Sequence, residues 1–175
     1  GTGWLATSRH IVTAAHVLTS GAKVRCWVGY DGDHDTWGAF VEAGRLRLHP
    51  KYLNDANPDY DVAVIELPEP LAIPALNLGD PAAQSSGQRH CAGYPEDKGG
   101  LAMYEARGEE KARVVNRVFH DIDTDEGQSG SPIWSGMGHN VVAVHTGHGG
   151  DPHPDLNRGV SMNAEIVAWL TDQFD

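Results

Sequence analysis

Cysteine is scarce in this chain. The 175 residues include only Cys26 and Cys91, so a framework of several disulfides is excluded. A single disulfide between the two stays open, but each lies in an apolar, strand-like run, one in each half of the chain, where a buried free thiol is equally natural. We expect both thiols to be unpaired.

Positive charge and long apolar runs are also in short supply. The chain has 13 Lys and Arg residues and 24 Asp and Glu residues, which gives a formal net charge of −11. Nucleic acid and anionic membrane surfaces would be repelled, so we expect neither as a partner. The sequence contains no run of 18 apolar residues, which is about the length that a helix needs to span a bilayer. The chain has no signal peptide, but it starts at Gly1 without Met, so we expect a mature or truncated chain that can be part of a longer one.

The most informative stretch that is present is Gly127-Gln128-Ser129-Gly130. A serine between glycines in a tight turn can present its hydroxyl on an exposed bend, while the N–H groups of Gly127 and Ser129 converge on one point. Acyl transfer needs this geometry: a nucleophile at Ser129 and an oxyanion hole built from the two amides. An ordinary β-turn explains the stretch equally well in isolation. The interpretation therefore depends on a base and a buried acid elsewhere.

Both groups can be found upstream. His16 follows the apolar pair Ile11-Val12 and the small residues 13–15, which leave its ring room to turn toward another segment. Asp61 directly precedes a strongly β-forming run, where it could be half-buried and orient an imidazole. Asp59 competes with Asp61 for this role. We prefer Asp61 because it adjoins the strand.

Taken in the order His16, Asp61, Ser129, these segments resemble the chymotrypsin-like serine proteases. Within that group the motifs are similar to those of the bacterial glutamyl endopeptidases: Gly-Gln-Ser-Gly-Ser-Pro at 127–132, Gly93-Tyr94-Pro95 with Asp97-Lys98, and Val144-His145-Thr146-Gly147. The resemblance covers nearly the whole chain. It implies a serine endopeptidase that cleaves polypeptides after glutamate, with aspartate as a weaker substrate. It also leads us to favour secretion over the cytoplasm, although the sequence does not fix the compartment.

The resemblance also implies which residues bind the substrate. Thr124 and His145 match the positions that glutamyl endopeptidases use to bind a carboxylate, and His148 could add a further donor. Asp123, however, stands where trypsin-like enzymes carry the acid that selects Arg and Lys. A preference for basic residues therefore remains the alternative, unless Asp123 turns outward while Thr124 turns in.

The pattern along the chain predicts an all-β fold. Short strands separated by glycine-rich turns indicate a barrel or sandwich, and the resemblance implies two antiparallel, six-stranded-type β-barrels, the first without its N-terminal strand. We expect one peptidase domain with a first barrel over residues 1–79, a crossing near 80–88 and a second barrel over 89–162. Asn163 can cap a closing amphipathic helix over 163–174, and residues 49–58 are interpreted as a loop.

Other functions are less well supported. His145, His148 and His153 match no common zinc spacing, so we expect neither metal nor cofactor. We expect a monomer. A non-catalytic barrel that binds peptides, or a structural domain of a larger protein, remains the alternative from another class.

Overall fold

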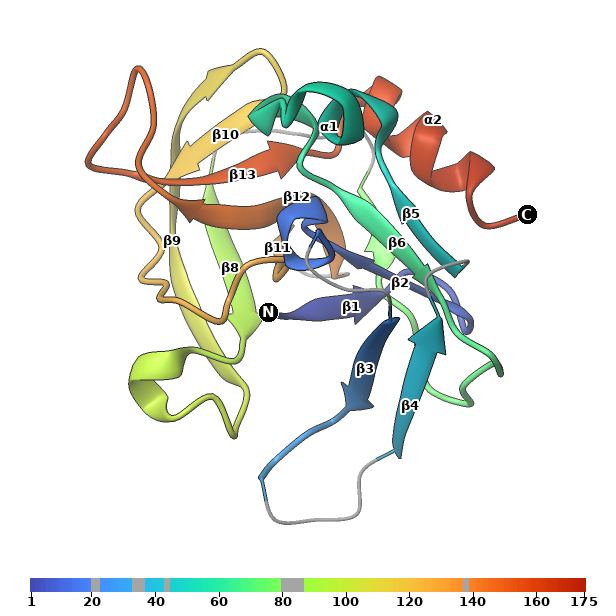
Figure 1. Cartoon of the computed structure of the whole chain (residues 1–175). Helices are drawn as coiled ribbons and strands as arrows, with labels where there is room; N and C mark the ends of the chain where they lie inside the picture. The colour runs from blue at the N-terminus through green and yellow to red at the C-terminus, as the bar shows by residue number, and fades with distance from the viewer. Residues whose placement is uncertain (20–22, 33–36, 43–44, 80–86, 137–138) are drawn as a thin grey trace.

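The computed structural model describes residues 1–19, 23–32, 37–42, 45–79, 87–136 and 139–175. It consists mainly of short antiparallel strands, with two α-helices (Figure 1). The strands are β1 Gly3–Leu5, β2 His10–Thr13, β3 Lys23–Val28, β4 Trp37–Glu42, β5 Leu46–Leu48, β6 Ala63–Glu66, β7 Asn77–Leu78, β8 Gln88–Gly93, β9 Tyr104–Val114, β10 Arg117–His120, β11 Pro132–Ser135, β12 Asn140–His148 and β13 Asn157–Ser161. The helices are α1 Pro50–Asp55 and α2 Ala164–Asp172, with 3-10 turns η1 Ala15–Val17, η3 Pro58–Tyr60 and η5 Glu96–Lys98.

The first half contains a four-stranded sheet in the order β1-β2-β6-β5 and a two-stranded sheet of β3 and β4. Strands β2 and β6 run antiparallel, and Thr13 faces Ala63 across the pair. The chain leaves β2 toward His16 at the same end at which Asp61 leads into β6. This register therefore brings two residues 45 positions apart to one edge of the sheet.

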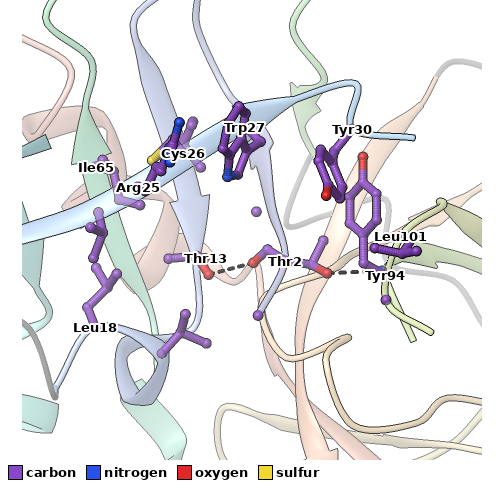
Figure 2. A pocket seen from close by; sticks show the side chains of 16 residues that line it. Thr2, Thr13, Leu18, Arg25, Cys26, Trp27, Tyr30, Ile65, Tyr94 and Leu101 are labelled. Carbon is purple, nitrogen blue, oxygen red and sulfur yellow. Dashed lines mark hydrogen bonds between the residues drawn. The ribbon is translucent and has the colours of Figure 1, made fainter. Parts of the chain in front are cut away.

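The first half is open between two strands. In the described part of the chain, β1 pairs only with β2 and β3 pairs only with β4. A groove of about 470 Å³ lies between β1 and β3, with Cys26, Trp27 and Ile65 among its lining residues (Figure 2). Among the described residues, no strand pairing joins β1 to β3 across this groove.

The second half is a closed barrel. Six strands follow one another in the order β11-β8-β9-β10-β13-β12, and pairing between β11 and β12 closes the ring. Strand β7 joins through a parallel pairing with β12. The predicted all-β fold is confirmed, and its second barrel has six strands.

Helix α2 packs against both halves. Asn163 caps it by accepting a hydrogen bond from the Ile166 amide at 3.0 Å, as the sequence predicted. Ile166 and Leu170 are completely buried in a cluster with Trp4, Val64 and other residues of the barrels. No described helix is long and apolar enough to cross a membrane.

One detail differs from the sequence analysis. Residues 50–55 form helix α1 rather than a loop, because Pro50 occupies a first helical position and the His49 side chain accepts from the Lys51 amide. Most of the predicted crossing lies outside the described residues, because 80–86 are not among them.

Both cysteines are free and buried, one in β3 and one in β8. The prediction of unpaired thiols is therefore confirmed. Burial raises the pKa of Cys26 to about 11 and that of Cys91 to about 12, so both stay protonated at neutral pH.

Candidate active site

His16 and Asp61 contact each other twice. The Asp61 carboxylate accepts a hydrogen bond from the His16 backbone amide at 2.9 Å, and its second oxygen lies 2.7 Å from Nδ1 of the ring. The Asp61 side chain is only 10% exposed, whereas the His16 side chain is 35% exposed. Because a carboxylate accepts, Nδ1 carries the proton in the neutral ring, and Nε2 is left as a proton acceptor.

Asp59 has a different partner. Its carboxylate lies 2.7 Å from Nε of Arg117, and both side chains are largely buried. The pair joins η3 to strand β10. The geometry therefore separates the two candidate acids: Asp61 contacts His16, and Asp59 holds the two halves together.

The loop that carries Ser129 is closed by its own neighbours. The Gln128 side chain accepts from the Asp125 amide at 2.8 Å, while the Gln128 amide donates to the Asp125 carbonyl at 3.2 Å. Gln128 is 3% exposed, so its amide group replaces the hydrogen bonds that this tight turn would otherwise lose. Ser129 itself remains half-buried. The Gln128 contacts were not foreseen from the sequence.

Thr2 ties the nucleophile loop to the first half. Its amide donates to the Ser129 carbonyl at 2.8 Å, and its hydroxyl donates to the Gly127 carbonyl at 2.9 Å. Thr13, at the end of β2, donates in turn to the Thr2 carbonyl at 2.6 Å (Figure 2). The strand that leads to His16 is thus joined to the loop that carries Ser129. Sequence reasoning missed Thr2 because a threonine between two glycines carries no distinctive signal.

A cavity of about 350 Å³ opens beside Ser129. Its walls include the three predicted substrate-binding residues, Thr124, His145 and His148, and the other lining residues are Asp125, Glu126, Gly147 and Asn157. Asp123 is exposed and does not line the cavity. The structure therefore brings Ser129 together with all three predicted binding residues and leaves Asp123 outside.

The backbone fixes His145 against the nucleophile loop. Gly130 donates to the His145 carbonyl at 2.7 Å, and the His145 amide donates to the Ser131 carbonyl at 2.9 Å. Gly130 has a φ of +94°, and a Cβ there would lie 2.0 Å from the Thr2 carbonyl oxygen. Only glycine fits between these two segments.

His145 and His120 form a buried pair. Nδ1 of His145 lies 3.3 Å from Nε2 of His120, and the two residues are 2% and 1% exposed. Burial lowers the pKa of His120 to about 4. Burial, with His120, His16 and Arg158 nearby, lowers the pKa of His145 to about 3. Both rings are therefore neutral at neutral pH.

Neutrality leaves one favourable proton arrangement for the pair. If the Nε2 proton of His120 is donated to Nδ1 of His145, then His145 carries its own proton on Nε2. Within this pair, Nδ1 of His120 is then a buried lone pair without a hydrogen-bond partner among the described residues. An unpaired acceptor is tolerated better than an unpaired N–H. This arrangement gives His145 a free Nε2–H donor.

The hydrogen bonding of two other cavity-lining side chains is also defined. The Thr124 hydroxyl is buried and has no hydrogen-bond partner among the described residues. Nδ1 of His148 lies 3.0 Å from Oδ1 of Asn157, whose amide nitrogen donates to the Ile122 carbonyl. Because Oδ1 can only accept, the His148 Nδ1 must donate. His148 therefore offers a second donor, at Nε2, only when its ring is protonated.

No described group of three or more His, Cys, Asp or Glu side chains is arranged to hold a metal ion. His153, the third member of the histidine group considered for zinc, packs against the ring of Phe119. It is not among the residues that line the cavity.

Comparison with known proteins bears on this geometry. A family model described as a trypsin-like peptidase domain matches residues 1–144. The chain belongs to this family. The resemblance to chymotrypsin-like serine proteases is thereby confirmed.

Curated relatives of this trypsin-like peptidase domain come from animals and bacteria. It is 26% identical to serine protease 23 of Rattus norvegicus and of Homo sapiens over 219 residues, which cover 99% of the chain and 57% of each relative. It is 27% identical to the glutamyl endopeptidase of Bacillus licheniformis over 189 residues, which cover 98% of the chain and 58% of the relative. The chain thus spans somewhat more than half the length of these relatives.

A solved structure, described as a Glu endopeptidase in complex with MPD, is similar to this peptidase domain with a TM-score of 0.85. The match covers 97% of the chain and 83% of the solved chain, at 22% identity. At this identity the likeness establishes the fold. The predicted trypsin-like fold is therefore confirmed.

Proposed function

We propose that this peptidase domain is a serine endopeptidase that uses Ser129, His16 and Asp61 and cleaves polypeptides after glutamate, with aspartate as a weaker substrate. The observation that carries the proposal is the double contact between Asp61 and His16, since it leaves Nε2 of the ring ready to accept a proton. We infer that the active form is a monomer.

The proposed chemistry proceeds through an acyl-enzyme. Ser129 Oγ attacks the carbonyl carbon of the substrate while its proton passes to Nε2 of His16. The imidazolium is stabilised by Asp61 and returns the proton to the leaving amine as the C–N bond breaks. Water then hydrolyses the ester by the same sequence, with His16 again as the base.

The oxyanion of each tetrahedral intermediate would be bound by the N–H groups of Gly127 and Ser129. Neither amide has an acceptor among the described residues. A preorganised donor of this kind is worth on the order of 10²- to 10³-fold in kcat.

Preference for glutamate follows from the donors in the cavity wall. The Thr124 hydroxyl has no hydrogen-bond partner among the described residues, and the proton arrangement inferred for the pair with His120 leaves His145 with an Nε2–H donor. A substrate carboxylate in this cavity would accept from both. A hydrogen bond to a charged group contributes about 1.5–3 kcal/mol. Arg158, which is close enough to lower the pKa of His145, adds positive potential on the same side.

One observation favours a second candidate, cleavage after Lys or Arg. Asp125 and Glu126 also line the cavity, and their charges would attract a basic side chain. We favour glutamate because the Asp125 carboxylate already accepts from the Glu126 amide at 2.6 Å, whereas the Thr124 hydroxyl has no partner among the described residues.

Four peptides that differ only in Glu, Asp, Lys or Leu before the scissile bond decide between the candidates. We expect the highest kcat/KM for Glu and a selective loss of the Glu preference in His145→Ala. His90→Ala is a matched control, because His90 pairs with Glu105 outside the cavity. Faster cleavage after Lys would reverse the assignment, and an unaltered Glu preference in His145→Ala would remove its proposed basis.

The non-catalytic alternative is tested separately. An organophosphonate probe forms a covalent bond only with an activated serine, so we expect labelling of the wild-type chain and none of Ser129→Ala. An unlabelled wild-type chain that still binds peptides would support a binding module instead.

A further inference from the structure

The two proposed oxyanion donors are oriented by different segments. In a trans peptide the N–H and the C=O point in opposite directions, so whatever holds the carbonyl also aims the amide. The Ser129 N–H shares a peptide with the Gln128 carbonyl, which accepts from the Ser131 amide, three residues after Gln128 in the same turn, at 2.9 Å. This hold is local to the nucleophile loop.

The Gly127 N–H depends on a distant segment. It shares a peptide with the Glu126 carbonyl, which accepts from the Glu96 backbone amide at 2.7 Å. Glu96 is the first residue of the 3-10 turn η5, so its amide has no partner within the turn and is free to donate outward. The Glu96 amide therefore draws the Glu126 carbonyl toward η5 and turns the Gly127 N–H away from it.

The η5 segment also packs directly on Gly127. A Cβ at Gly127 would lie 2.3 Å from the Tyr94 carbonyl oxygen, and the φ of Gly127 is +88°. Thr2 connects these two segments. Its hydroxyl accepts from the Tyr94 amide at 3.2 Å and donates to the Gly127 carbonyl at 2.9 Å (Figure 2 draws the bond to Tyr94). Residues 94–96 are thus held against the nucleophile loop.

Glycine makes the orientation of this peptide easy to lose. A glycine populates positive and negative φ about equally, so rotation of the Glu126–Gly127 peptide meets little steric resistance at Gly127. Rotation would turn the Glu126 carbonyl toward the site and the Gly127 N–H toward the Glu96 N–H, and two donors repel. The Glu96 amide is the group that disfavours the rotated state.

We propose that the backbone N–H of Glu96 is a positioning group for catalysis, which holds the Glu126–Gly127 peptide in the orientation that supplies the Gly127 N–H to the oxyanion. The inference rests on the proposed function, because it concerns the rate of the same acyl transfer. According to this inference, kcat depends on the exposed turn η5, which does not line the cavity.

A proline at position 96 tests the role of this single N–H. Pro95 has φ −72° and ψ 137°, the conformation that a residue before proline prefers, and a first helical position tolerates proline. Glu96→Pro deletes the donor and puts the ring Cδ against the Glu126 oxygen. Glu96→Ala keeps the donor and removes only the side chain.

We expect kcat of the Pro variant to fall on the order of 10²-fold below that of the Ala variant, with KM little changed. The affinity of a peptide boronate, whose oxygen accepts from the oxyanion hole, is expected to fall by a similar factor. In the Ser129→Ala background, the Kd of the intact substrate and the melting temperature are expected to agree between the Pro and Ala variants. A merely structural role would lower the melting temperature without this split.

If the Pro variant fails to fold, a second pair of variants tests the same inference. Gly99 ends η5 with φ +87° and has open space around it, so Gly99→Val disfavours the turn and Gly99→Asn tolerates it. We expect kcat to be lower in Gly99→Val than in Gly99→Asn. Equal kcat within both pairs, in an active wild type, overturns this inference alone. A wild-type chain without Ser129-dependent turnover overturns the proposed function and this inference with it.

Discussion

Asp61 binds His16 through both of its carboxylate oxygens, one at the backbone amide and one at the ring. Asp61→Asn would replace one acceptor by an amide donor, and the ring would then favour the tautomer that cannot take a proton from Ser129. We expect kcat to fall on the order of 10⁴-fold, measured with the best peptide substrate. Asp59→Asn is the control, because Asp59 pairs with Arg117 instead. Equal losses in the two variants would contradict the assignment of Asp61.

His120 predicts that the fold loses stability in acid. Its pKa is lowered from 6.5 to about 4 in the folded chain, so between these values the unfolded chain binds a proton that the folded chain does not. The contribution of His120 to the free energy of unfolding is therefore fully present above pH 6.5, and it declines as pH falls toward 4. From pH 7.5 to 5 the decline amounts to about 2 kcal/mol.

Urea unfolding of the wild type and of His120→Gln at these two pH values measures this contribution. Glutamine keeps an N–H for His145 but does not titrate, so we expect the variant to lose about 2 kcal/mol less between pH 7.5 and 5. An equal loss in both chains would show that other groups cause the acid sensitivity.

The cysteines predict slow thiol chemistry. Both are buried and their pKa values are raised, so a thiol reagent such as dithionitrobenzoate should react with neither in the native protein and with both after unfolding in denaturant. Reductant is expected to leave the melting temperature unchanged. A drop in melting temperature with reductant would reveal a disulfide.

The sequence predicted the elements whose signals are local. Three patterns each predict an element from a few neighbouring residues: Ile11-Val12 before His16, the apolar run after Asp61, and the Asn163 cap. The corresponding elements β2, β6 and α2 lie where they were expected. The preference for Asp61 over Asp59 also relied on a local cue, its place beside the strand. The structure explains it by a contact with Arg117 that no local pattern contains.

The contacts that the sequence did not predict join segments far apart in the chain. Thr2 with Gly127, His120 with His145, and Glu96 with Glu126 each depend on how the two halves and their loops meet. Two of these contacts involve backbone atoms, which every residue carries, so residue identity gives no signal for them. The pairing of His120 adds a reason why His145 presents a donor to the cavity.

The buried cluster shared by strands β1 and β6 with helix α2 affects how the protein is made. Val64 is synthesised about 100 residues before Ile166, and Trp4 about 160 residues before it, which takes on the order of 5–30 s at ordinary translation rates. During that interval their apolar side chains have no native partner to cover them. This part of the core is therefore completed only after residues 164–172 have been synthesised.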